Sequence, residues 1–386
     1  MKDNKRTVAV LGATGSVGGN TAKVLEVNQE RFKVLTLAAN SNIQELARQA
    51  KIFAPQTVIT ADPTRLTELQ NVLPAGCCGR SGIEAMVEAA VDPELDVLLC
   101  AIVGTAGIAP VLAALEAGKT VALASKEVMV SAGELVLETL QRNPQAKIVP
   151  VDSEHSGVFQ CLAGVDRKEI AKIRLTASGG PFRTWSREKI ENASLEETLA
   201  HPTWSMGCKI TIDSASMMNK ALELVEAKFL FGVGREKLAV LVNPQSAVHA
   251  MVEMVDGTLI AQVAAPDMQQ PIAYGLSYPE RLSKPRSKID LAALQKLEFF
   301  APDREKFPSF DFADAALDAG GTLPCAMNAA NEVAVERFRK GEINFGGIWK
   351  IVGEVMEKWQ NEPQSSFAQI TEAENEARRK AAEVKI

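Results

Sequence analysis

Short apolar runs alternate with helical patterns through the first 150 residues of the chain. This alternation predicts a parallel β-sheet wrapped by helices, because parallel neighbours need a crossover connection between them. The expected strands lie at 7–11, 33–38, 57–60, 96–102, 120–124 and 147–151. We therefore expect an α/β fold for this part of the chain.

A glycine-rich turn follows the first expected strand directly. Residues 12–18 read GATGSVG, and a helical pattern continues over 20–27. Glycines let the backbone turn sharply and approach a pyrophosphate, and the N–H groups at a helix start attract its charge. The context favours a dinucleotide-binding turn. Because the spacing is G-x-x-G-x-x-G rather than G-x-G-x-x-G, a purely structural turn remains the alternative.

Two strand ends bear on the choice of dinucleotide and on the site around it. The second strand ends at Asn40, Ser41 and Asn42, where an NAD site usually has an acid for the ribose 2′-hydroxyl. No carboxylate repels a 2′-phosphate there, and Asn and Ser can donate hydrogen bonds to it, so NADP(H) is favoured over NAD(H). The alternative is a merely polar loop at the strand end. Lys126 and Glu127 follow the strand at 120–124, at the edge where such sheets bind ligands, although a surface ion pair gives the same pattern.

A pair of acids follows the last of these strands. Asp152 and Glu154 lie two positions apart, and in extended chain they would share one face. Close carboxylates repel one another unless a cation lies between them, which favours a divalent metal site. The alternative is a solvated loop with an acid that caps the next helix.

Polar residues also line one side of a later helical pattern, which includes Leu222, Val225 and Phe229. Asn219, Lys220 and Glu223 are three or four positions apart, so they share one side of this helix. We expect Asp213 or Ser214 to cap its start. With Ser214, the stripe offers a hydroxyl, an amide and an ammonium for a phosphate, beside a carboxylate for a metal. An exposed helix with an i, i+3 ion pair is the alternative.

Two segments between the acids and this helix have a composition typical of binding loops. The turn at Ser178, followed by two glycines, can present N–H groups to a phosphate. The stretch HPTWSMG, 201–207, combines His201, Trp204 and Met206 with proline and glycine, which suits a mobile lid over a substrate. Alternatively, Trp204 and Met206 belong to the core.

Composition excludes several classes of protein. The net charge of −6 comes from 42 basic and 48 acidic residues without a basic stripe, so nucleic acid is not an expected partner. The sequence has no signal-peptide pattern and no apolar run of membrane-spanning length, so we expect a cytoplasmic protein without a membrane partner. Its six cysteines lack C-x-x-C spacing and are expected to be free thiols.

Taken together, the motifs resemble those of the 1-deoxy-D-xylulose 5-phosphate reductoisomerase family over nearly the whole chain. The resemblance implies NADPH- and metal-dependent rearrangement and reduction of 1-deoxy-D-xylulose 5-phosphate to 2-C-methyl-D-erythritol 4-phosphate, in isoprenoid precursor biosynthesis. The matching motifs are GATGSVG (12–18), AIVGTAG (101–107), SKE (125–127), PVDSEHSG (150–157), SGGPFR (178–183), HPTWSMG (201–207), DSASMMNKALE (213–223), NPQSAVHAMV (243–252), PDMQQPI (266–272) and MNAANEVAV (327–335).

The resemblance also implies roles for individual residues. Asp152, Glu154 and Glu223 match the ligands of one Mg²⁺ or Mn²⁺ ion, with Co²⁺ possible. Ser178, Ser214, Asn219 and Lys220 match phosphate-binding residues, Ser153 a contact to substrate hydroxyls, His201 and Trp204 residues of a closing flap, and Lys126 a residue at the substrate. The cofactor-contacting positions are matched by Gly12, Thr14, Gly15, Ser16, Val17, Asn40, Ser41, Asn42, Ser125, Glu127 and Gly207.

The family's plan further implies a Rossmann-like NADPH-binding domain (1–150), an α+β catalytic and dimerisation domain (151–276), a proline-rich linker (277–303) and a C-terminal helical bundle (304–386). Within the last part, helical patterns lie at 312–319, 323–340, 348–359 and 367–384. The family is homodimeric, so a homodimer is expected.

The sequence departs from the family pattern at Ser41, where Lys or Arg is frequent, and at Ser125, where Asn is frequent. These departures concern NADPH affinity more than the reaction. Two other functions stay open. One is a non-catalytic NADP-binding sensor, and the other an NADP-dependent aldehyde or semialdehyde dehydrogenase, which needs a nucleophilic cysteine near a histidine base. Cys161 follows His155 by six positions, but it lies in an apolar helical pattern typical of a core.

Overall fold

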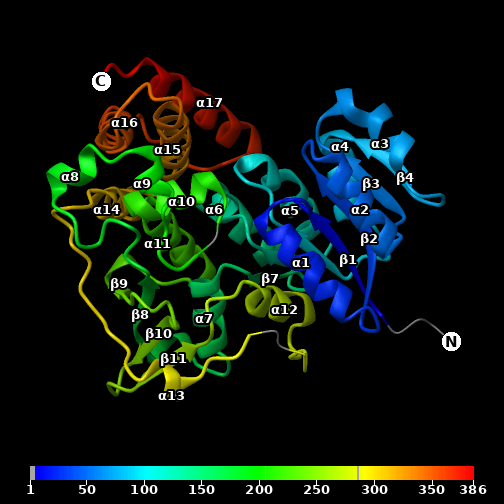
Figure 1. Cartoon of the computed structure of the whole chain (residues 1–386), viewed down its shortest axis with the longest axis horizontal. Helices are drawn as coiled ribbons and strands as arrows, with labels where there is room; N and C mark the ends of the chain where they lie inside the picture. The colour runs from blue at the N-terminus through cyan, green and yellow to red at the C-terminus, as the bar shows by residue number, and fades with distance from the viewer. Residues whose placement is uncertain (1–4, 205, 285–286) are drawn as a thin grey trace. The chain divides into compact units, whose positions relative to one another are not determined.

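The computed structural model describes residues 5–204, 206–284 and 287–386. The chain divides into two compact units, each with a β-sheet of its own (Figure 1). The first unit comprises Met1–Val128, Val136–Ser156 and Asp267–Ser287, and the second comprises Met129–Leu135, Gly157–Pro266 and Lys288–Ile386. The division of 1–386 into three domains and a linker therefore stays a prediction.

The first unit is built on a seven-stranded sheet in which all neighbouring strands are parallel. The strand order is β4-β3-β2-β1-β5-β6-β7, so the order reverses direction between β1 and β5. Ligands of such sheets bind outside the carboxyl ends of the strands at this reversal. The strands are β1 (Arg6–Leu11), β2 (Phe32–Ala39), β3 (Thr57–Thr60), β4 (Cys78–Ser81), β5 (Val97–Cys100), β6 (Thr120–Leu123) and β7 (Lys147–Pro150).

All six strands expected from the apolar runs are present, within two residues at each end. Sequence reasoning missed β4, which reads CGRS and lies at the edge of the sheet. A short polar edge strand leaves no apolar run to recognise, because neither of its faces needs to be buried deeply. The Rossmann-like α/β prediction for this part of the chain is confirmed.

Helices connect and cover the strands of the first unit. Helix α12 returns to this unit late in the chain, and its Ile272 and Leu276 join the same buried core as Val8 and Val24. The helices are α1 (Ser16–Val27), α2 (Ile43–Phe53), α3 (Leu66–Val72), α4 (Gly82–Ala90), α5 (Ile108–Glu116), α6 (Lys126–Arg142), α12 (Gln269–Ser277) and the first residues of α7 (Ser153–Cys161).

The second unit contains a four-stranded mixed sheet in the order β11-β10-β8-β9. Strands β8 and β9 are parallel, whereas β10 is antiparallel to both β8 and β11. The strands are β8 (Ile170–Ala177), β9 (Leu238–Val242), β10 (Val248–Met254) and β11 (Leu259–Val263).

Helices make up the rest of the second unit. The bundle helices α14, α15, α16 and α17 lie close to the predicted patterns, and α15 packs against both α16 and α17. Within the described part of the stretch expected to be an extended linker, one short helix, α13, is present. The helices are α8 (Arg187–Glu191), α9 (Leu195–Leu199), α10 (Cys208–Ser216), α11 (Met218–Phe231), α13 (Leu291–Leu294), α14 (Ser309–Ala319), α15 (Leu323–Arg339), α16 (Phe345–Glu357) and α17 (Phe367–Glu383).

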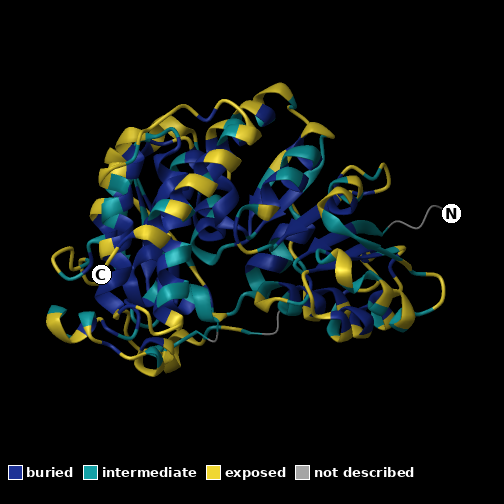
Figure 2. Cartoon of the chain, turned by 90° about the horizontal axis from the view of Figure 1, so that it is seen from above, coloured by how far each residue is buried: buried dark blue, intermediate teal, exposed yellow. Residues whose placement is uncertain are grey.

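The two units have the same pattern of burial. The sheet interiors are buried, and exposed residues lie on the outer faces of the helices and in the loops (Figure 2). Within the described residues, no helix is long and apolar enough to cross a membrane.

Candidate functional site

The glycine turn after β1 is required by close backbone packing. Gly12 has φ +89°, and a Cβ atom there would lie 2.3 Å from the carbonyl oxygen of Ala101 after β5. A Cβ atom on Gly18 would lie 2.2 Å from the carbonyl oxygen of Gly12, so α1 rests directly on the turn. Gly15 is the exposed N-cap of α1, where no side chain among the described residues caps the helix. The first N–H groups of α1 can therefore face a ligand.

The other predicted residues of this turn surround that helix start. Ser16 is the exposed first residue of α1, and Thr14 is half-buried just before it. Val17 packs against the core of the unit. The arrangement suits contacts to a pyrophosphate through backbone N–H groups, with the side chains in supporting positions.

The loop after β2 is polar and exposed, as expected for the ribose end of a dinucleotide. Asn40, Ser41 and Asn42 are all exposed. The Oδ1 atom of Asn42 accepts a hydrogen bond from the backbone N–H of Glu45 at 3.2 Å, so this side chain caps α2. Asn40 and Ser41 are the two side chains of this loop without a capping role in the structure.

Sequence reasoning missed a cation beside this loop. Arg65, which follows β3, donates from Nη1 to the carbonyl oxygen of Ser41 at 2.7 Å. Its Nε and Nη2 atoms pair with the carboxylate of Glu68. Nη2 contacts both oxygens of that carboxylate, so the second N–H of Nη1 is the donor that can reach a ligand. The sequence did contain a signal for this contact. Arg65 follows β3 by five residues, and β3 pairs with β2, so both strands end at the same edge of the sheet and Arg65 can reach the loop after β2.

Ser125, Lys126 and Glu127 lie at the end of β6, where α6 begins. The hydroxyl of Ser125 donates to the carbonyl oxygen of Ile102 at 2.5 Å and so ties two strand ends together. Lys126 is only 6% exposed, and its Nζ atom lies 2.6 Å from Oδ2 of Asp152. The surface ion-pair alternative for Lys126 and Glu127 is therefore wrong, because both side chains are buried.

The backbone that carries the two acids after β7 is not the extended strand that the sequence predicted. Strand β7 ends at Pro150 and α7 begins at Ser153, so Asp152 and Glu154 do not share the face of an extended strand. That prediction of shared strand geometry is wrong. Glu154 lies in the first helical turn, and Ser153 donates from Oγ to its Oε2 atom at 2.5 Å. Both acids still lie at the carboxyl edge of the sheet, because the strand ends just before them.

In the second unit, a turn with two glycines places Ser178 beside Ser214. Gly179 and Gly180 have φ values of +88° and +64°, which favour glycine. A Cβ atom on Gly180 would lie 2.9 Å from the carbonyl oxygen of Ser214, so the turn lies directly on α10. The backbone N–H of Gly180 donates to Oγ of Ser178 at 3.1 Å. Two of the predicted phosphate ligands are therefore neighbours.

His201 connects the predicted flap to this turn. Its Nδ1 atom accepts hydrogen bonds from the backbone N–H groups of Thr203 and Trp204, at 3.1 and 2.9 Å. The proton of the neutral ring therefore lies on Nε2, which donates to Oγ of Ser178 at 3.0 Å. Burial lowers the pKa of His201, which favours this neutral form.

The remaining flap residues are partly exposed. Trp204 is half-buried, and its ring centroid lies 6.2 Å from that of His249. Met206 is also half-buried, and Gly207 is the exposed N-cap of α10. Neither Trp204 nor Met206 is fully buried, as the core alternative would require. Ser205 lies outside the described residues.

Asp213 and Ser214 do not cap the polar helix, so that prediction is wrong. Both lie inside α10, and Met217 separates α10 from α11 with a left-handed backbone at φ +62°. The sequence concealed this break because methionine rarely adopts a positive φ.

The polar stripe itself lies on α11, in its first two turns. Asn219 and Lys220 both donate to the carboxylate of Glu223. Lys220 is 3% exposed and Glu223 is 0% exposed. The exposed-helix alternative is therefore wrong. A buried ammonium balances a buried carboxylate within this helix.

These features define a class of protein: a nucleotide-binding α/β enzyme with a second unit whose hydroxyl, amide and ammonium groups suit an anionic substrate. Family models cover most of the chain. That of 1-deoxy-D-xylulose 5-phosphate reductoisomerase matches residues 8–133, that of its C-terminal domain 148–231, and that of a DXP reductoisomerase C-terminal domain 263–380. The chain belongs to the 1-deoxy-D-xylulose 5-phosphate reductoisomerase family, as the motifs predicted.

Individual relatives agree over nearly full length. The reductoisomerase of Pelotomaculum thermopropionicum is 46% identical over 378 residues, which cover 97% of each chain. The structure of the Zymomonas mobilis enzyme in complex with NADPH is 42% identical, with a TM-score of 0.92 and 98% of each chain covered. A reductoisomerase in complex with NADPH, fosmidomycin and magnesium is 37% identical, with a TM-score of 0.91 and coverage of 98% of this chain and 97% of that chain. The roles of individual residues stay predictions.

Proposed function

We propose that this chain converts 1-deoxy-D-xylulose 5-phosphate to 2-C-methyl-D-erythritol 4-phosphate, with NADPH and a divalent metal ion. It is an NADP-dependent oxidoreductase and isomerase of isoprenoid precursor biosynthesis. The observation that carries this proposal is the family match over nearly the whole chain. NADPH and magnesium occupy related structures.

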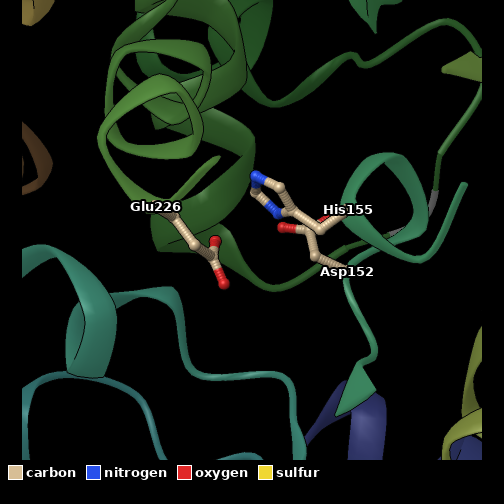
Figure 3. A group of neighbouring side chains, drawn as sticks. All are labelled: Asp152, His155 and Glu226. Carbon is tan, nitrogen blue, oxygen red and sulfur yellow. The ribbon is translucent and has the colours of Figure 1, made fainter. Parts of the chain in front are cut away.

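The metal ligands in this proposal are Asp152, Glu154 and Glu223, one of two side-chain sets among the described residues that could hold an ion. The other set is Asp152, His155 and Glu226 (Figure 3). Mg²⁺ and Mn²⁺ prefer oxygen ligands, which favours the set of three carboxylates. When bound, such an ion polarises the ketone and hydroxyl oxygens of the substrate and stabilises negative charge on them.

Lys126 lies beside Asp152, one of the proposed metal ligands. Its ammonium lies against Asp152, so it orients the carboxylate and offsets part of its charge. A neighbouring cation favours the ionised form of a carboxylate, which is the form that binds metals. The placement of Lys126 at the start of α6 also allows it to donate to a substrate oxygen.

The substrate phosphate is assigned to Ser178, Ser214, Asn219 and Lys220 in the second unit. The hydroxyl of Ser178 accepts from both His201 and Gly180, so its own proton is available to donate to a phosphate oxygen. Phosphate binding lies away from the reacting carbons, so its binding energy can drive closure of the flap and exclude water. His201 and Trp204 are the flap residues that would cover the substrate.

NADPH supplies the hydride, and its proposed site lies on the first unit. The glycine turn and the start of α1 suit its pyrophosphate, and the loop with Asn40 and Ser41 suits its 2′-phosphate. Arg65 contributes the positive charge that is missing at position 41 itself. Ser125 and Glu127 at the start of α6, together with Gly207 of the flap, complete the proposed contact set.

The dehydrogenase alternative needs a reactive cysteine, and the structure shows that Cys161 is not suited to this role. Burial raises the pKa of the Cys161 thiol to about 11, and the side chain lies in the core. A buried protonated thiol is a poor nucleophile at neutral pH. The sensor alternative remains, because it predicts the same fold, and turnover distinguishes it.

Assembly and location complete the proposal. We propose a homodimer, supported by the exposed apolar residues of β11, a strand at the end of the four-stranded sheet. Leu259 is 55% exposed and Ile260 is 37% exposed, and such an edge is suited to association. Light scattering of the purified protein tests this.

We also propose a cytoplasmic location, since the six cysteines are free thiols, which suits a reducing compartment.

The test is the loss of NADPH absorbance with 1-deoxy-D-xylulose 5-phosphate and Mn²⁺, with and without EDTA. We expect EDTA-sensitive turnover in the wild type and at least about a thousandfold loss in Asp152→Asn, because several kcal/mol of charge stabilisation depend on the metal. Asp166→Asn, which changes an exposed capping acid, serves as the control. A folded wild-type protein that binds NADPH without turnover would overturn the proposal in favour of a sensor.

A further inference from the structure

The last turn of α10 is fastened to the C-terminal bundle through a buried acid. Asp213 is 1% exposed, and its Oδ1 atom accepts a hydrogen bond from Nδ2 of Asn331 on α15 at 2.8 Å. Its Oδ2 atom lies 2.8 Å from Nζ of Lys209, one turn earlier on α10. Asn331 is fully buried. The carboxylate is therefore held between an ammonium of its own helix and an amide of another.

A second attachment lies three residues further along α10. The carbonyl oxygen of Ser216 accepts hydrogen bonds from Oγ of Ser309 on α14 at 2.7 Å and from Nε1 of Trp349 on α16 at 3.1 Å. The chain then passes through the left-handed Met217 into α11. The two bundle side chains thus donate to a carbonyl group at the end of a helix, where intrahelical donors run out.

Ser214 lies between these two attachments. On its other side, Gly180 packs against its carbonyl oxygen, so the turn that carries Ser178 rests on this segment. The stripe residues Asn219 and Lys220 lie in the first turn of α11, shortly after the break. All the side chains assigned to the phosphate therefore depend on where the last turn of α10 lies.

We propose that Asn331 is a positioning residue for phosphate binding, which acts through Asp213 to fix Ser214 and the start of α11. This inference rests on the proposed function only for the identity of the phosphate ester. Loss of the amide leaves a buried carboxylate oxygen without its donor, and the last turn of α10 then shifts towards other donors. Small displacements of binding groups are costly, because several donors must meet one phosphate together.

The decisive variant is Asn331→Leu, with Asn328→Leu as the matched control. Asn328 is also fully buried on α15, but its amide donates to Glu332 of the same helix at 3.0 Å and not to α10. We expect Asn331→Leu to raise KM for the phosphorylated substrate about tenfold, as for loss of one hydrogen bond to a buried charge. The kcat and the dissociation constant of NADPH should stay near the wild-type values, and Asn328→Leu should leave KM unchanged.

A binding measurement separates this inference from the proposed function. Calorimetric titration with inorganic phosphate should give about tenfold weaker binding for Asn331→Leu than for the wild type, whether or not the protein turns over the substrate. If the wild type binds phosphate without turnover, only the proposed function fails. If the folded variant binds phosphate as the wild type does, the positioning role is overturned.

Two further variants decide the matter if Asn331→Leu does not fold. The exchange Asp213→Asn with Asn331→Asp restores an amide–carboxylate hydrogen bond in reversed order, so it should recover most of the phosphate affinity lost in Asp213→Asn alone. Trp349→Phe removes one donor to the Ser216 carbonyl and keeps an aromatic ring, so it should weaken phosphate binding to a smaller extent. Unchanged affinity in Trp349→Phe and no recovery in the exchange would together overturn the inference.

Discussion

Each unit of the molecule contains a pair of a buried lysine and a nearby carboxylate, and the two pairs are built in different ways. In the first unit, Lys126 and Asp152 come from the ends of two neighbouring parallel strands and lie 2.6 Å apart. In the second unit, Lys220 and Glu223 are three positions apart on α11. The side chains of the first pair are 7% and 15% exposed, and those of the second are 3% and 1% exposed.

The difference shows two routes to the same electrostatic balance. The first pair exists only when β6 and β7 are paired, because the sheet brings their ends together. The second pair exists wherever α11 is helical. In both units, a lysine offsets the charge of an acid assigned to the metal, which lowers the electrostatic cost of keeping that acid ionised. The helical pair is the more deeply buried, and its loss should therefore cost more.

The largest effect is expected from Lys220→Met compared with Lys126→Met. Removal of one partner from a buried ion pair costs about 3–5 kcal/mol of unfolding free energy, and Lys220→Met should lie in that range. Lys126→Met should cost less, because Asp152 is nearer to water. Urea denaturation of both variants measures the difference. Equal losses, or a larger loss for Lys126→Met, would contradict the ranking by burial.

Stabilisation by Mg²⁺ tests whether Asp152 and Glu223 are both metal ligands. Mg²⁺ at about 100 times its dissociation constant should raise the unfolding free energy of the wild type by about 2.7 kcal/mol. Asp152→Asn and Glu223→Gln should each abolish this increase, whereas Glu236→Gln, an exposed acid beyond α11, should retain it. Thermal denaturation with and without Mg²⁺ tests this. If either of the first two variants keeps the full increase, that acid is not a ligand.

A smaller effect is expected at the cofactor end of the first unit. Arg65→Gln should weaken NADPH binding about tenfold relative to NADH, because a charge-assisted hydrogen bond to the 2′-phosphate is lost. Arg48→Gln is the matched control, since Arg48 also pairs with a glutamate three positions away but has no contact with the Ser41 loop. Fluorescence titration with each dinucleotide gives both dissociation constants. An unchanged ratio would remove Arg65 from the site.

The smallest effect is the pH dependence of the flap in the second unit. Burial lowers the pKa of His201, so the folded state binds fewer protons than the unfolded state when the pH falls below the ordinary histidine pKa of about 6.5. The contribution of neutral His201 to the unfolding free energy is complete above that pKa and is lost as the pH falls further. His201→Gln should show a flatter fall in melting temperature between neutral and mildly acidic pH. A parallel fall in variant and wild type would rule out this contribution.

Most of the fold followed from local patterns in the sequence. The strands of the first unit are continuous apolar runs because both faces of a parallel sheet are buried, and that signal is strong. The bundle helices were visible from their 3.6-residue period. The strand β4 was invisible because its residues are polar and it lies at an edge, and the break at Met217 was invisible because it depends on tertiary contacts with the bundle.

The site was predictable in its residue types but less so in its geometry. The acids and the polar stripe of α11 stood out because unpaired charges near apolar runs need a partner. The strand geometry assumed for Asp152 and Glu154 failed because β7 ends early and a helix begins at once. Arg65 was missed because its relation to Ser41 arises from the pairing of β2 and β3 and not from any spacing along the chain.

The return of α12 to the first unit has a consequence for synthesis of the protein. Ile272 and Leu276 complete a core whose other members lie mostly before residue 152, yet the ribosome makes them only after the whole of the second sheet. A nascent chain of the first 150 residues would therefore expose the apolar surface that α12 later covers. Domains generally fold as units during translation, so the first unit stays open while the second emerges, and chaperones have the longest access to the face that α12 finally closes.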